Sequence, residues 1–140
     1  MCNEMPHQPT ILQKPEYTPE VVVDNTQYNN DIKDSYMWNG IQMKMNSIRG
    51  VSRYDVNMCA MIQLGKWFDY LRDIGVYDNT RIILASDHGF QTKQFDNLLV
   101  EDKLDIMSYS CLLMVKDFDA EGFVISEEYM TNADVPVLAS

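Results

Sequence analysis

The chain has few basic residues and only two histidines. Of its 140 residues, 11 are Lys or Arg and 21 are Asp or Glu, which gives a formal net charge of −10. Non-specific binding to nucleic acid depends on basic side chains that neutralise phosphates, and binding to an anionic membrane surface has the same requirement. We therefore expect no nucleic-acid partner and no direct docking on anionic lipid. An anionic substrate is compatible with this charge, because a bound cation can reverse the local field.

Disulfides and membrane spans are also not expected. The three cysteines form no CxxC pair, and an odd count argues against a disulfide framework. No apolar run is long enough to span a bilayer, and residues 1–10 lack the apolar centre of a signal peptide. Any contact with a membrane would therefore come through an anchor outside this chain.

Length and composition favour one domain with a real core, since 46% of the residues are hydrophobic. The chain starts without a lead-in element and stops, at residues 136–140, in what reads as the first turn of a helix. We therefore expect residues 1–140 to be a single domain that is a fragment of a larger one. Within it, residues 1–30 are predicted to be an irregular, loop-rich segment, because prolines that lack a backbone donor recur there at Pro6, Pro9, Pro15 and Pro19.

Helices and strands alternate in the rest of the predicted fold. A rough apolar stripe favours a helix over residues 31–48, and a clearer stripe predicts a second helix with Ser52 as N-cap and Gly75 as its stop. Strands are predicted at 81–86 and 109–115, and a terminal helix begins near residue 134, capped by Thr131 or Asn132. A helix, a short loop and a buried strand make half of an α/β unit. We predict an α/β fold with a mixed or mostly parallel sheet and flanking helices.

The most informative residues follow the apolar run Ile82-Ile83-Leu84-Ala85. Asp87 and His88 stand at its end, where a sheet of this class places its ligands. A carboxylate oxygen and an imidazole nitrogen suit Zn²⁺ or Mn²⁺, with Mg²⁺ or Ca²⁺ as alternatives. We expect Gly89 to turn the backbone away with a positive φ and to leave room for a ligand. An ordinary strand end, with a solvated His88 and Asp87 capping the next turn, is the competing interpretation.

Other candidates for chemistry are fewer. His7 lies in a loop stiffened by two prolines; it is either a surface histidine or an imidazole held toward a substrate oxyanion. Thr10 and Ser86 carry hydroxyl groups, but there is no GxSxG nucleophile elbow, which disfavours a Ser-His-Asp hydrolase. A flavodoxin-like nucleotide-binding domain would need a phosphate loop near the start, for which residues 6–19 are a poor match.

The segment from Tyr54 to Gly89 resembles the sulfatase branch of the alkaline phosphatase superfamily. The residues that carry the resemblance are Leu64-Gly65-Lys66-Trp67-Phe68-Asp69-Tyr70-Leu71, Tyr77-Asp78-Asn79-Thr80 and Ser86-Asp87-His88-Gly89. The similarity is greatest to lipoteichoic acid synthases, phosphoethanolamine transferases and their sulfatase-like relatives. It implies a partial alkaline-phosphatase-like fold, formed by the C-terminal part of a catalytic domain, in which Asp87 and His88 are metal ligands.

Two further segments resemble motifs of this family. Residues 132–136 resemble its D-x-x-P-T helix start, with Val137 where Thr is usual. Residues 6–9 resemble its T-H-x-P loop, with Pro6 in the place of Thr. The role that this second likeness implies for His7 is contact with the phosphate or sulfate of the substrate.

The resemblance implies a hydrolase or transferase that acts on phosphate or sulfate esters through a covalent intermediate. It also implies that the full-length parent is anchored in the membrane and lies on its extracytoplasmic side. In the family the nucleophile and an earlier acidic ligand precede the T-H-x-P loop, and no residue here takes either role. We therefore expect this fragment alone to be inactive. The alternative is a non-catalytic binding or interaction module with a degenerate metal site. An upstream Glu or Asp at a strand end, followed by Thr or Ser at a helix start, would favour the enzyme.

Overall fold

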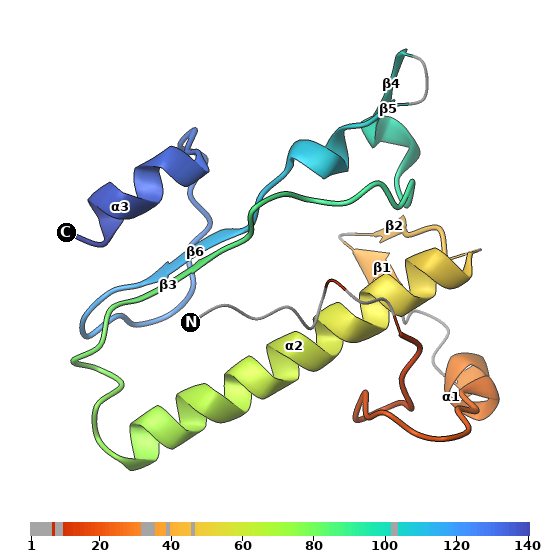
Figure 1. Cartoon of the computed structure of the whole chain (residues 1–140), viewed down its shortest axis with the longest axis horizontal. Coiled ribbons are helices and arrows are strands. Elements are labelled where there is room, and N and C mark those ends of the chain that lie inside the picture. The colour runs from red at the N-terminus through yellow and green to blue at the C-terminus, as the bar shows by residue number, and fades with distance from the viewer. Residues whose placement is uncertain (1–6, 8–9, 32–35, 39, 46, 102–103) are drawn as a thin grey trace. The chain divides into compact units, whose positions relative to one another are not determined.

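The computed structural model describes residues 7, 10–31, 36–38, 40–45, 47–101 and 104–140. These residues form a mixed α/β structure (Figure 1). Its helices are α1 (Thr26–Asp31), α2 (Ile48–Asp73) and α3 (Val135–Leu138), and its strands are β1 (Met37–Trp38), β2 (Ile41–Gln42), β3 (Ile82–Ala85), β4 (Leu99–Val100), β5 (Leu104–Asp105) and β6 (Leu113–Lys116). Short 3₁₀ helices occur at Asp96–Leu98, Ile106–Tyr109 and Asn132–Asp134. None of the helices in the described ranges is long and apolar enough to cross a membrane.

The chain divides into two compact units. The first comprises Met1–Lys66 and Thr92–Leu99, and the second comprises Trp67–Gln91 and Val100–Ser140. Helix α2 contributes residues to both units. His7 belongs to the first unit, whereas Asp87 and His88 belong to the second.

The prediction of a mixed or mostly parallel sheet is wrong for β3 and β6. These strands pair antiparallel, with Ile82 opposite Lys116 and Ala85 opposite Leu113 (Figure 1). Strands β1 and β2 also pair antiparallel. A parallel pair needs a crossover that carries the chain back to the other end of the sheet, usually an α-helix. Between β3 and β6 the described residues form only 3₁₀ turns and two short strands, and the chain re-enters the pair at the end where it left.

A small hydrophobic cluster forms a core in the first unit. It contains Leu12 and Tyr17 from the N-terminal segment, and Val56 and Cys59 from α2. A buried ion pair borders it, because Lys14 Nζ lies 3.5 Å from Asp55 Oδ1 and both side chains are almost completely buried. Asp55 Oδ2 also accepts a hydrogen bond from the Leu12 backbone at 3.1 Å. The N-terminal segment that contains Leu12 and Lys14 is therefore held to α2 through one carboxylate.

Aromatic rings surround the Lys14 ammonium. Its Nζ lies between 4.9 and 6.0 Å from the ring centroids of Tyr17, Tyr28, Tyr36 and Tyr54. The ammonium also donates to the Tyr36 hydroxyl at 2.6 Å and to Asn29 Oδ1 at 3.4 Å. Burial raises the pKa of the Tyr17 and Tyr54 phenols, so both rings stay neutral beside the ion pair. The faces of these rings attract a cation and offset part of its lost hydration.

Two predictions for the first unit are wrong. Residues 31–48 were expected to form a helix, but Trp38 pairs with Ile41, and Gly40 between them has a φ of +77°. Asn-Gly is the strongest short hairpin signal, and it overrides the apolar stripe. Ser52 lies inside α2, where its hydroxyl donates to Arg49 O at 3.2 Å. Ser47 is the capping residue, since its Oγ accepts from Gly50 N at 3.0 Å.

The second unit begins with the end of α2, which stops as predicted. Gly75 has a φ of +71°, its amide donates to Arg72 O at 2.9 Å, and the amide of Val76 donates to Leu71 O at 3.0 Å. These two bonds make a Schellman motif. Lys116 of β6 then donates to the carbonyls of Tyr77, Asp78 and Thr80. The turn that leads into β3 is thus tied to the end of β6.

We expect Asp55→Ala to lower the free energy of unfolding by about 3–5 kcal/mol, because it leaves the Lys14 ammonium buried without its counter-charge. Urea unfolding of the whole chain measures this. Asp69→Ala removes an exposed carboxylate from the same helix and should change stability by less than about 1 kcal/mol. Equal effects of the two substitutions would contradict a special role for the buried pair.

Asp117 gives a pH-dependent prediction. Hydrogen bonds from Arg81, at 2.9 and 3.2 Å, and from the Phe118 amide lower the pKa of its carboxyl group. A carboxyl group whose pKa is lower in the folded state stabilises the protein at pH values above its pKa in the unfolded chain. This stabilisation is lost as the pH falls through the pKa of the folded state. A carboxyl-carbon NMR titration should show the midpoint of Asp117 rising in Arg81→Met. An unchanged midpoint would show that Arg81 does not act on this carboxylate.

Candidate functional site

The chain stays paired for one residue beyond β3. The Ser86 amide donates to Leu112 O at 2.9 Å, and the Leu112 amide donates to Ser86 Oγ at 2.7 Å. Ser86 is therefore a structural residue whose hydroxyl accepts a backbone bond. Asp87 and His88 come after the regular strand has ended, so the alternation of strand side chains does not force them onto opposite faces.

The side chains of Asp87 and His88 meet at this strand end. His88 Nε2 lies 3.6 Å from Asp87 Oδ2, and the His88 amide donates to Asp87 Oδ1 at 2.9 Å. Both side chains face solvent, with 62% of His88 and 88% of Asp87 exposed. The other ring nitrogen, Nδ1, lies 2.6 Å from the carbonyl oxygen of Gly89. The carbonyl can only accept, so Nδ1 carries the proton.

This geometry fits two ligands of one divalent cation. A metal-bound histidine usually donates its second ring N–H to a carbonyl or carboxylate, which fixes the tautomer. Here that donor is Nδ1, and in the neutral ring the lone pair of Nε2 is available to a ligand. Two atoms bound to one ion at about 2.0–2.2 Å can lie at most about 4.4 Å apart, and the observed separation of 3.6 Å satisfies this limit.

The coordination shell is not complete within the described residues. They contain no group of three His, Cys, Asp or Glu side chains that could hold a metal. A stable site usually has at least three protein ligands. Asp87 and His88 by themselves do not reach this number.

Gly89 has a different role from the predicted one. It is not among the glycines with positive φ, and the space above its Cα is filled. A Cβ there would overlap the carbonyl oxygen of Met107 and lie 2.7 Å from that of Ser110. The Gly89 amide donates to Ser108 O at 3.1 Å. Glycine is needed because the backbone of residues 107–110 passes too close for any side chain, and the room expected for a ligand is taken by that backbone.

Asn132 also belongs to this region, although the sequence indicated it as a possible helix cap and as part of the segment 132–136 that resembles a family motif, without a contact to Asp87. Its Nδ2 donates to Ser86 O at 3.0 Å and to Asp87 O at 3.1 Å. The Cys111 thiol also contacts the Asp87 carbonyl, with Sγ 3.5 Å from Asp87 O. Of the two predicted caps, Thr131 caps the 3₁₀ helix Asn132–Asp134 through a capping box with Asp134, whereas α3 itself begins after Asp134 without a side-chain cap bond. No local pattern could show that Asn132 reaches back to residues 86 and 87.

No site contact is described for the other predicted residues. His7 is exposed, and Pro6, Gln8 and Pro9 of the resembling loop lie outside the described residues. Thr10 is exposed. The structure brings Asp87 and His88 together.

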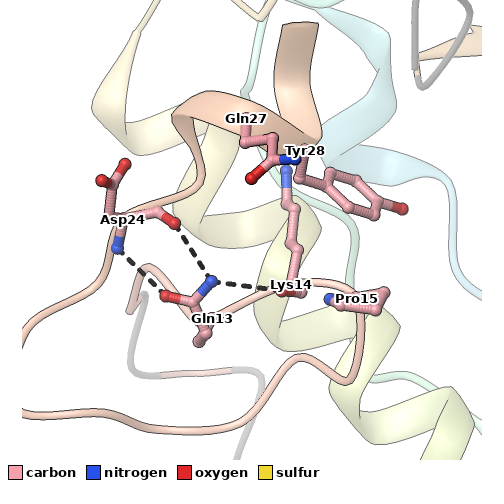
Figure 2. A pocket seen from close by; sticks show the side chains of 6 residues that line it. All are labelled: Gln13, Lys14, Pro15, Asp24, Gln27 and Tyr28. Carbon is pink, nitrogen blue, oxygen red and sulfur yellow. Dashed lines mark hydrogen bonds between the residues drawn. The ribbon is translucent and has the colours of Figure 1, made fainter. Parts of the chain in front are cut away.

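A cavity of about 260 Å³ lies in the first unit, and none of the predicted site residues lines it. Its walls are formed by Gln13, Lys14, Pro15, Asp24, Gln27 and Tyr28 (Figure 2). Figure 2 shows that the Gln13 amide bonds the backbone of Asp24, through Nε2 to Asp24 O at 3.1 Å and through Oε1 to Asp24 N at 3.0 Å. The Lys14 ammonium is paired with Asp55. These groups hold the fold together and are not directed at a ligand.

No protein-family model, curated protein or solved structure matches the chain. A functional proposal therefore rests on the chain's own residues, on their contacts and on the motifs that carry the resemblance.

We expect Gly89→Ala to destabilise the second unit by about 1–3 kcal/mol or more, because the new methyl group overlaps the backbone at Met107. Gly65→Ala is the matched control. Gly65 lies in α2 with open space around it, so alanine should stabilise the helix by up to about 1 kcal/mol. Urea unfolding of both variants checks this. A neutral Gly89→Ala would contradict the close approach.

Proposed function

We propose that the chain carries part of a metal-dependent site that hydrolyses or transfers phosphate or sulfate esters. The observation that supports this best is the Asp87–His88 pair: a carboxylate and an Nε2 atom 3.6 Å apart, exposed at a strand end, with Nδ1 bonded to Gly89 O. The resemblance to the sulfatase branch of the alkaline phosphatase superfamily supplies the reaction class. The finer assignment to an alkaline-phosphatase-like fold and to a membrane-anchored, extracytoplasmic parent rests on that resemblance alone.

In this proposal each residue has a definite task. Asp87 and His88 hold a divalent cation, with Zn²⁺ or Mn²⁺ preferred and Mg²⁺ or Ca²⁺ as alternatives. When bound, such a cation lowers the pKa of a coordinated hydroxyl and offsets charge on the transferring group. His7 donates a hydrogen bond to a non-bridging oxygen of the ester. The nucleophile and the further ligands come from residues outside this chain, so the 140-residue chain alone does not turn over an ester.

The second candidate is a binding or interaction module in which the metal site has degenerated. It is favoured by the same pair, because the described residues add no third ligand and the two side chains are largely exposed. The two candidates differ in whether the pair binds a cation at all.

Mn²⁺ titration monitored by proton NMR tests the pair directly. The chain has only two histidines, so its imidazole signals can be assigned with His7→Ala and His88→Ala. We expect Mn²⁺ to broaden the His88 signal, and Asp87→Ala to remove the broadening because one of two ligands is lost. Asp73→Ala, at the exposed end of α2, is the control for general attraction to an acidic protein. Asp73→Ala should keep the broadening, and broadening that survives in Asp87→Ala as well would contradict the proposed site.

Activity is tested on a longer parent chain, with phosphate and sulfate esters as substrates. We expect turnover that needs a divalent cation and falls by orders of magnitude in Asp87→Ala. If the Asp87→Ala variant of the parent chain kept both metal and activity, Asp87 would not be a metal ligand. Robust turnover by the 140-residue chain itself would contradict the assignment of the nucleophile to another segment.

A further inference from the structure

We infer that Asn132 is a positioning residue for the Asp87–His88 pair, and that it acts by holding the backbone on both sides of Asp87. This inference rests on the proposed function. Nothing in the resemblance assigns this role to Asn132, whose side-chain amide donates to the backbone on either side of the Asp87 Cα and not to the Asp87 carboxylate. The Asn132 amide binds two carbonyl groups, those of Ser86 and Asp87.

The two acceptors of Asn132 belong to neighbouring peptide units. The carbonyl of Ser86 lies in the planar unit before the Asp87 Cα, and the carbonyl of Asp87 lies in the unit after it. Asn132 Nδ2 donates to the first at 3.0 Å and to the second at 3.1 Å. Because each peptide unit is planar, the orientation of both units sets φ and ψ at the Cα between them. One amide group therefore restricts the backbone of Asp87, and with it the direction in which the carboxylate projects.

Asn132 is itself held in place from both sides. It opens the 3₁₀ helix Asn132–Asp134, whose capping box joins the Thr131 amide to Asp134 Oδ2 at 2.7 Å. At the other end of α3, Leu138 O accepts from Arg81 Nη1 at 3.1 Å. The segment from residue 131 to 138 thus contacts the chain just before β3 and just after it, and Figure 1 shows α3 beside this strand. A side chain supported in this way can fix its acceptors.

Cys111 is a weaker partner of the same carbonyl. Its Sγ lies 3.5 Å from Asp87 O and 3.7 Å from Asn132 Nδ2. A thiol is a poor donor compared with an amide. The amide of Asn132 is therefore the stronger of these two side-chain constraints on Asp87.

Asn132→Leu tests the inference, because leucine has a similar volume and no donor. Two quantities are measured on the whole chain: Mn²⁺ broadening of the His88 imidazole signal, and the amide–Hα coupling constant of Asp87, which reports φ. We expect the Mn²⁺ dissociation constant to rise by about tenfold or more, as for other residues that orient metal ligands, and the coupling constant to move toward an averaged value. Asn79→Leu, an exposed position in the same unit, is the matched control and should change neither.

The outcomes separate the inference from the proposed function. A variant that loses stability but keeps the Asp87 coupling constant and the Mn²⁺ affinity would overturn the positioning role and leave the metal site intact. Absence of Mn²⁺ broadening in the unsubstituted chain would overturn the proposed function, and the coupling constant would still decide whether Asn132 holds Asp87.

Discussion

The close contact between the backbone at Ser86–Gly89 and the backbone at Met107–Leu112 is the constraint on which the candidate site depends. Bonds from Ser86 to Leu112 and from Gly89 to Ser108 close the two ends of this contact. Gly89 permits it because any side chain there would meet the opposing carbonyls. Asp87 and His88 lie between the two anchored positions. Their side chains are exposed, but the backbone that carries them is fixed.

The first unit is stabilised by a different device. A carboxylate of α2 neutralises one buried ammonium, and tyrosine rings around that ammonium replace part of its hydration. An unpaired buried charge would lower the stability of the fold, so the ion pair joins the N-terminal segment to the helix specifically. This ion pair explains why Asp55 is buried. None of the residues proposed for metal binding takes part in it.

Features with local signals could be predicted from the sequence. The strand at 82–85 and the stop at Gly75 each depend on residues within a few positions, and the structure confirms both. Thr131, one of the two predicted caps, caps the 3₁₀ helix that precedes α3. Strand direction could not be predicted, since an apolar run has the same pattern in parallel and antiparallel pairs. The requirement for glycine at position 89 could not be predicted either, because it comes from the carbonyl groups of Met107 and Ser110, which are distant in the sequence. Asn132 shows the same limit at the site, where its acceptors are 45 and 46 residues away.

The central claim is that Asp87 and His88 bind one divalent cation together. Anomalous X-ray scattering at the zinc edge, from crystals of the chain grown with Zn²⁺, tests it most directly. The account predicts a zinc ion about 2.0–2.2 Å from an Asp87 carboxylate oxygen and from His88 Nε2. Zinc bound only at His7 or at other surface carboxylates, with the Asp87–His88 pair unchanged, would contradict it.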